Sequence, residues 1–350
     1  MQITQILKDA SEKKASDVFI IAGLPISYRH NGNLEDYNTV KLMPQDTKDI
    51  ITEIYDMANN RDIKKLTEDG DDDFSFAIPG IARFRVSAYM QRGSMAAVLR
   101  IIAFELPDYH NLNIPEQIIG LGNASSGMVL VTGPAGSGKS TTLACIIDMV
   151  NKSVRRHIIT IEDPIEYLHK HNRSIVSQRE LNLDTKSFAA SLKATLRQSP
   201  DIILLGEMRD YDTIAIAMTA AETGHLLLST LHTIGASNTI DRIIDVFPAN
   251  QQHQIAVQLS CTLNAVISQQ LLPTVTGEIV PAFEIMTVTP AIRNMIRDGK
   301  IFQLDGTVFS AHGNNGMVSM DNSIQKLYNQ GIISKETALT FAINPDRLGI

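Results

Sequence analysis

The feature that most constrains this chain is a glycine-rich segment between a strand pattern and a helix pattern. The segment matches G-x-x-x-x-G-K-[ST] in full and consists of Gly133, Pro134, Ala135, Gly136, Ser137, Gly138, Lys139 and Ser140, with Thr141 directly after it. Residues 128–132 form a short apolar run of strand type, whereas Leu143, Ile146, Ile147 and Val150 recur at helical spacing. This order of strand, loop and helix predicts an α/β fold built around a phosphate-binding loop.

Each fixed residue of the loop has a role in holding a nucleoside triphosphate. Glycines let backbone N–H groups approach the phosphates, and the start of the following helix adds the positive end of its dipole. We expect Lys139 to reach the outer phosphates and Ser140 to ligate Mg²⁺. The sequence therefore predicts ATP and Mg²⁺ as cofactors. An accidental glycine-rich turn is the alternative, and the strand and helix on either side argue against it.

Length, charge and composition narrow the class of protein. At 350 residues the chain can bury two separate cores. Its net charge is −7 and it has no long run of basic residues, so we expect no nucleic-acid partner. It has neither a secretory leader nor a long apolar segment, which predicts a cytoplasmic protein without direct membrane insertion. Cys145 and Cys261 are expected to be buried small hydrophobic residues rather than a disulfide or a zinc site.

Residues 1–105 have the pattern of an α+β domain. A short amphipathic helix is expected at the start, then a hairpin at Asn31-Gly32 and a charged helix over residues 45–67. Two strand-like runs, 73–78 and 82–89, are joined by a Pro-Gly turn.

Residues 106–126 are rich in proline and glycine and are expected to form a linker. From 127 to 350, short apolar runs of strand type alternate with helical patterns. These runs cover residues 128–132, 158–161, 202–205 and 226–231. Because they are mainly apolar on both sides, they suit the middle of a sheet that is covered by helices on both faces.

Acidic residues follow two of these runs. In P-loop enzymes a carboxylate at the tip of the strand beside the loop holds Mg²⁺ water ligands or orients the attacking water. Glu207 follows run 202–205 and is the first candidate for both roles. Glu162 and Glu166 lie around a proline after run 158–161 and are candidates for general base or metal ligand. A solvated acidic turn is the alternative for this pair, and the choice of base between Glu207 and Glu162 stays open.

Two histidines flank the run 226–231. His225 and His232 are seven residues apart, so on a strand they point to opposite faces and cannot share a metal. His232 is expected at the same sheet edge as the phosphate-binding loop, where it could sense the γ-phosphate. Ser229 and Thr230 could do the same or could satisfy local backbone groups.

Arginines are concentrated in the N-terminal domain. They are Arg83, Arg85, Arg92 and Arg100. No comparable arginine cluster accompanies the motifs of the second domain, and P-loop enzymes commonly receive a transition-state arginine from a neighbouring subunit. We therefore expect an arginine donated across a subunit interface, with exposed strand faces as the simpler explanation.

Together these motifs resemble the secretion ATPases of the type II and type IV pilus class, nearly from end to end. The matching segments are the phosphate-binding loop, an acidic box at 160–167, the strand end at 206–210, a histidine box at 223–233, and residues 73–76, 82–86 and 239–248. Residues 291–297 resemble the C-terminal signature of retraction ATPases. They are expected to form a helix capped by Thr289, opened by Pro290 and closed by Gly299. The chain also has too few cysteines for the four-cysteine zinc insertion that is usual in assembly ATPases.

The resemblance implies a PAS-like N-terminal domain followed by a RecA-like P-loop ATPase domain with a C-terminal helical region. It implies a homo-hexameric ring, with ATP bound between domains of adjacent subunits, that powers pilus retraction and twitching motility. Such a motor works at the inner face of the cytoplasmic membrane on an inner-membrane platform protein, and a second retraction ATPase is a further candidate partner. By position, the family's Walker and box residues are Lys139, Ser140, Glu162, Glu207, His225 and His232, and its trans-acting arginines are Arg85 and Arg100.

Three other functions fit parts of the pattern. An accessory or assembly ATPase of the same class shares most of these motifs. A RecA-like nucleic-acid translocase shares the core but should show a basic channel. A nucleotide-dependent binding module without turnover is the third, and the presence of Glu207 argues against it.

Overall fold

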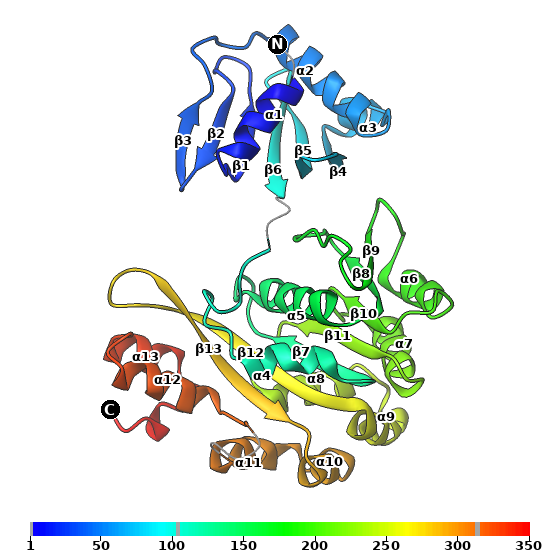
Figure 1. The fold of residues 1–350 in the computed structure, drawn as a ribbon, viewed down its shortest axis with the longest axis vertical. Coiled ribbons are helices and arrows are strands. Elements are labelled where there is room, and N and C mark those ends of the chain that lie inside the picture. Colours follow the sequence, from blue (N-terminus) through cyan, green and yellow to red (C-terminus); the bar gives the residue numbers. More distant parts are fainter. Residues whose placement is uncertain (1–2, 103–105, 312–315) are drawn as a thin grey trace. The chain divides into compact units, whose positions relative to one another are not determined.

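The structure is a computed structural model that describes residues 3–102, 106–311 and 316–350. The chain divides into two compact units, one of residues 1–105 and 166–168 and the other of residues 106–165 and 169–350. The domain boundary expected after residue 105 adjoins residues 103–105, which lie outside the described part. Each unit combines helices with a single sheet, so the expected α/β architecture is confirmed (Figure 1).

The first unit is a six-stranded antiparallel sheet with helices packed against it. Its elements are α1 (Ile3–Glu12), β1 (Asp17–Ile20), β2 (Ser27–His30), β3 (Asn33–Asp36), α2 (Pro44–Met57), α3 (Lys64–Asp69), β4 (Asp71–Ile78), β5 (Ala82–Gln91) and β6 (Ser94–Ile102). The strand order is β3-β2-β1-β6-β5-β4. Along β5, Ala82, Phe84 and Val86 are buried, whereas Arg85 between them is exposed. This alternation gives the sheet one face on the helices and one face in solvent.

The turns of this unit follow the sequence pattern, but one helix does not. The Asn31-Gly32 hairpin joins β2 to β3, with φ values of 49° and 82°. The helix expected over residues 45–67 is two helices, because α2 ends at Met57 and α3 begins at Lys64. Between them Asn59 and Asn60 adopt left-handed φ values of 59° and 54°, a conformation that asparagine tolerates and that interrupts a right-handed helix.

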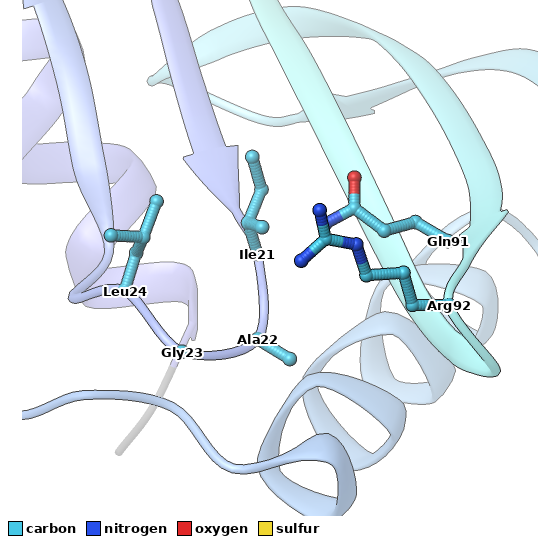
Figure 2. A pocket seen from close by; sticks show the side chains of 6 residues that line it. All are labelled: Ile21, Ala22, Gly23, Leu24, Gln91 and Arg92. Atoms are coloured by element: carbon cyan, nitrogen blue, oxygen red, sulfur yellow. The ribbon is translucent and has the colours of Figure 1, made fainter.

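A shallow hollow opens on this unit between the loop after β1 and the β5–β6 turn (Figure 2). Its lining residues are Ile21, Ala22, Gly23, Leu24, Gln91 and Arg92. Arg92 forms the tight turn together with Gly93, and both have positive φ.

The second unit is a seven-stranded sheet with helices on both faces. Its strands are β7 (Gly127–Thr132), β8 (His157–Glu162), β9 (Ile175–Glu180), β10 (Ile202–Leu205), β11 (Leu226–Leu231), β12 (Leu263–Pro273) and β13 (Ile279–Thr287). Its α-helices are α4 (Glu116–Gly120), α5 (Lys139–Ser153), α6 (Phe188–Thr195), α7 (Tyr211–Glu222), α8 (Ala236–Asp245), α9 (Ala249–Thr262), α10 (Pro290–Arg297), α11 (Leu304–Ser310), α12 (Met320–Asn329) and α13 (Lys335–Phe341). The strand order is β13-β12-β7-β11-β10-β8-β9, and only the pairing of β13 with β12 is antiparallel.

Strand β7 shows how the sheet is covered on both faces. Met128 and Leu130 belong to the core cluster that includes α7, α8 and α9, whereas Val129 and Val131 belong to the cluster that includes α5. Because neighbouring side chains on a strand point to opposite faces, a continuous apolar run is what a strand buried on both sides requires. The four strand runs expected in this domain are confirmed.

Part of the segment expected as a linker is folded onto this core. Ile118 and Ile119 of α4 are buried in the same cluster as Ile146 of α5. A Cβ added at Gly122 would lie 2.7 Å from a methyl carbon of Val150, so the chain passes very close to α5 here.

The C-terminal signature helix is confirmed as α10. The hydroxyl of Thr289 accepts a hydrogen bond from the Ile292 backbone N–H, and Ile292 and Ile296 are fully buried. Cys145 is buried as expected, but Cys261 is exposed, because it lies on the solvent side of α9. Among the described residues, no helix is both long and apolar enough to cross a bilayer.

Candidate active site

The phosphate-binding loop connects β7 to α5 through glycines with positive φ. The φ values are 142° at Gly133, 76° at Gly136 and 84° at Gly138. A Cβ at Gly133 would lie 2.2 Å from the backbone oxygen of Gln269, so glycine is required there for steric as well as conformational reasons. Successive backbone N–H groups in such turns form anion-binding concavities, as a phosphate loop needs.

Lys139 is held by the loop itself. Its side chain is buried, with 8% of the residue exposed, and its Nζ donates to the carbonyl oxygens of Gly133 (2.9 Å) and Pro134 (2.8 Å). The ammonium group therefore lies at the start of the loop, within reach of a phosphate bound there. Ser140, one residue further along α5, is exposed. The buried hydroxyl of Ser137 has no hydrogen-bond partner among the described residues.

The other candidate residues follow strands that end at the same edge of the sheet as this loop. Because β7, β11, β10 and β8 are parallel, their carboxyl ends coincide, which is where open α/β sheets bind ligands. His232 follows β11, Glu207 follows β10 and Glu162 ends β8.

The strand of Glu207, β10, was expected beside β7, the strand that leads into the loop, and this expectation is wrong. Strand β11 pairs with both β7 and β10 and separates them. Its place between them follows from a chain crossover that local patterns do not encode. As a consequence His232 lies between the phosphate-binding loop and Glu207.

Glu207 has two basic neighbours. Its Oε2 lies 3.5 Å from Nε2 of His232 and forms an ion pair with Nε of Arg209. The Glu207 side chain is only 13% exposed, whereas that of His232 is 52% exposed. Arg209 was missed by the sequence analysis, although its position two residues after Glu207 is visible in the sequence. A mostly buried carboxylate held by two basic groups keeps a fixed orientation, as a water-positioning residue requires.

Glu162 is held by polar side chains. Its Oε1 accepts hydrogen bonds from Oγ1 of Thr160 (2.6 Å) and Nε2 of Gln178 (3.2 Å). The amide oxygen of Gln178 in turn accepts a hydrogen bond from the backbone N–H of His169. Burial lowers the pKa of His169 to about 4, so its imidazole is neutral near pH 7. Glu166 lies in the exposed loop after β8.

His225 lies at the opposite edge of the sheet. It precedes β11, whose six residues span about 20 Å, while His232 follows that strand. Its Nδ1 lies 3.0 Å from the carbonyl oxygen of Ala220 and 3.2 Å from the hydroxyl of Thr223. Within one subunit the structure therefore does not bring His225 to the phosphate-binding loop.

Ser229 and Thr230 satisfy backbone groups of the neighbouring strand end. The Ser229 hydroxyl donates to the Leu205 carbonyl (2.7 Å), and the Thr230 hydroxyl donates to the Gly206 carbonyl (2.6 Å). Of the two explanations that the sequence left open, the structure supports the local one. These bonds fix β11 to the strand that carries Glu207.

Arg85 and Arg100 are directly opposite each other on neighbouring strands of the first unit. Both are exposed, and Nε of Arg100 lies 3.2 Å from a carboxylate oxygen of Asp17. Like charges in directly opposed positions of an antiparallel pair are destabilising. Such a pair on an exposed face suggests that the charges serve a purpose other than stability.

Gln269 is a further residue of the site that the sequence analysis missed. It lies on β12, is 3% exposed, and its Oε1 accepts a hydrogen bond from Oγ1 of Thr142 in α5 (2.7 Å). The available signal was the polar run of residues 268–270 inside an otherwise apolar strand.

The loop and the parallel sheet around it define a P-loop nucleotide-binding protein. The model of the Type II/IV secretion system protein family matches residues 1–326, and the chain belongs to this family. It is 44% identical to the type IV pilus retraction ATPase PilT of Pseudomonas aeruginosa over 99% of both chains. It is also 41% identical to a twitching motility protein of Neisseria gonorrhoeae, over 99% of this chain and 92% of that protein.

The fold agrees with these sequence comparisons. A crystal structure of the pilus retraction motor PilT with bound ADP superimposes with a TM-score of 0.90, at 44% identity and over 99% of both chains. The protein is therefore an ATPase that binds nucleotide, as its phosphate-binding loop predicted.

Proposed function

We propose that this protein is a hexameric motor that hydrolyses ATP to retract type IV pili. The observation that carries the proposal is the likeness to a retraction motor with bound ADP, which extends over 99% of both chains in sequence and in fold. A second named relative acts in twitching motility, which fits the same function. The resemblance of residues 291–297 to the retraction signature points the same way.

We infer that ATP lies with its phosphates in the loop of residues 133–141. Lys139 would exchange its two carbonyl partners for phosphate oxygens, since its ammonium group is already at the start of the loop. Mg²⁺ would be held by the hydroxyl of Ser140 and, through water, by the carboxylate of Glu207. Such oxygen donors suit this hard cation, which neutralises charge on the phosphates when it is bound.

The acidic residues and histidines would position the attacking water and respond to the γ-phosphate. Glu207, oriented by His232 and Arg209, is our first candidate to position the attacking water. Glu162 is the second candidate, and Glu166, in the loop after β8, is a third candidate for general base or metal ligand. His232 reports the state of the γ-phosphate to Glu207. His225 acts outside this cluster by holding the turn between α7 and β11.

The transition-state charge would be neutralised by Arg85 and Arg100 of an adjacent subunit. Their directly opposed positions on an exposed strand pair support this proposal, because the carboxylate of Asp17 lies beside Arg100 and a bound phosphate would offset the remaining positive charge. We further assign residues 1–105 to a PAS-like domain and residues 127–350 to a RecA-like domain with a C-terminal helical region. Of the intervening residues 106–126, α4 packs onto the core of the second domain, so only the part before α4 is proposed as a linker.

The cellular setting follows from the retraction function. We place the ring in the cytoplasm, at the inner face of the cytoplasmic membrane, on an inner-membrane platform protein of the pilus machine. A second retraction ATPase is a further proposed partner. Neither nucleic acid nor direct insertion into the membrane forms part of this proposal.

Deletion of the gene tests the function. The deletion strain should carry more surface pili than wild type and should lose twitching motility, because pili would still assemble but not retract. The wild-type gene should restore the normal number of pili and twitching motility. The variant Lys335→Ala, which changes an exposed lysine at the start of α13, should do the same, whereas Lys139→Ala should restore neither. Cells without pili would instead indicate an assembly ATPase, and normal twitching would indicate an accessory role.

A further inference from the structure

Strand β12 contains three consecutive buried polar residues. Ser268, Gln269 and Gln270 are 0%, 3% and 7% exposed, in a strand that is otherwise mostly apolar. Buried polar groups are costly unless they are hydrogen-bonded. The partners of these three side chains therefore indicate why polar residues occupy this strand.

Each of the three side chains binds a different element. The Ser268 hydroxyl accepts a hydrogen bond from the backbone N–H of Gly235 (3.0 Å), in the loop that follows His232. The Gln270 amide donates to the carbonyl of Phe341 (3.2 Å) in α13. Gln269 points to the other face of the sheet, toward α5, because side chains alternate along a strand.

Gln269 approaches the phosphate-binding loop at both of its ends. Its backbone oxygen would be 2.2 Å from a Cβ at Gly133, and its amide nitrogen would be 2.9 Å from a Cβ at Gly138. Its Oε1 accepts the hydroxyl hydrogen of Thr142, one turn into α5. One residue thus lies against the first and last glycines of the motif and is hydrogen-bonded to the helix that follows.

We propose that Gln269 is a positioning residue that fixes the phosphate-binding loop against β12 and thereby sets the affinity for nucleotide. A loop rich in glycine has few side chains of its own to hold its shape, and it loses much conformational freedom when it closes on phosphate. Gln269 removes part of that freedom before the nucleotide arrives. Gln269 would affect nucleotide binding indirectly, through its contacts with the loop backbone and its hydrogen bond with Thr142.

Two neighbouring substitutions separate this role from a general contribution to stability. Gln269→Met and Gln270→Met each replace a buried amide by an apolar side chain of similar length, and each removes one hydrogen bond. Binding of a fluorescent ADP analogue is titrated for both variants, and their thermal unfolding is recorded. Gln269→Met should raise the Kd about tenfold, the effect of one well-placed hydrogen bond, whereas Gln270→Met should keep the Kd within about twofold of wild type. In steady-state assays of Gln269→Met, the KM for ATP should rise by more than kcat falls.

Thr142→Val removes the same hydrogen bond from the other side. It should raise the Kd for the ADP analogue to a similar extent, and the double variant should bind no more weakly than the weaker single variant, because both changes break one contact. If Gln269→Met does not fold, Thr142→Val decides alone. A Kd within twofold of wild type for the folded variants, or an equal loss in Gln270→Met, would overturn the proposal.

Discussion

Lys139 is the residue on which the nucleotide chemistry depends most directly. The sequence motif predicted its role, and the structure adds that its ammonium group is buried and held by two backbone carbonyls of the loop. A phosphate oxygen is a stronger hydrogen-bond acceptor for an ammonium group than a neutral carbonyl oxygen. The position of Lys139 therefore favours binding of an anion at the loop.

Replacement of Lys139 tests this chemistry. We expect Lys139→Ala to lose ATP binding or turnover almost completely, because it removes the positive charge that the loop directs at the outer phosphates. The matched control is Lys152→Ala, which removes an exposed lysine from the last turn of the same helix. ATPase assays of the purified variants decide the matter, and near wild-type turnover by Lys139→Ala would refute the assignment of the loop.

The two candidate bases can be ranked by amide substitution. Glu207→Gln should keep ATP binding but block hydrolysis, because the amide retains the shape of the side chain and loses its charge. Glu162→Gln should lower turnover less, since its strand, β8, lies one strand further from β7 than β10, the strand that Glu207 follows. Single-turnover assays with bound ATP measure both. Normal turnover in Glu207→Gln together with a block in Glu162→Gln would reverse our ranking.

At the scale of the elements, apolar runs and turn residues were predictable, whereas pairings between distant segments were not. The runs that became β7, β8, β10 and β11 are apolar on both faces, so their burial could be read directly. Strands β9, β12 and β13 went unpredicted, because β9 is largely polar and β12 carries the buried Ser268, Gln269 and Gln270. Such polar positions are explained only by partners far away in the sequence.

The β5–β6 pair makes an element-scale prediction about stability. Arg85→Gln should leave the free energy of unfolding unchanged or raise it by about 0.5 kcal/mol, because it removes a like charge directly opposite Arg100. The thermal midpoint should therefore stay the same or rise slightly. The matched control is Arg83→Gln on the same face of β5, where the opposed residue is Ile102 and no such gain is expected. Calorimetry of the full chain measures both variants. A clear drop in the midpoint of Arg85→Gln would mean that Arg85 serves the fold itself.

At the scale of the whole molecule, the order of the motifs along the chain is enough to indicate the family. The order of the motifs does not determine the order of the strands in the sheet. Strand β11 lies between the strand of the phosphate-binding loop and the strand of Glu207. This crossover places His232 within 3.5 Å of Glu207, a contact that no local pattern encodes. Most of the candidate residues and their common sheet edge were thus predictable, whereas the contact of His232 with Glu207 was not.

The central claim is that each ATP site is completed by arginines from another subunit. In a ring with one repeated interface, every site takes its loop from one subunit and its arginines from the next. The most direct test mixes two inactive variants, Arg85→Ala and Lys139→Ala, under conditions in which subunits exchange.

Mixing should restore ATPase activity, because some interfaces then combine an intact loop with an intact arginine. At equal amounts of the two variants, on the order of a quarter of the sites should be complete. Each variant alone stays inactive, and exchange is verified with labelled wild-type subunits. Recovery that is greatest near equal proportions is the result we predict. If subunits exchange but no proportion restores activity, the trans-arginine account is contradicted.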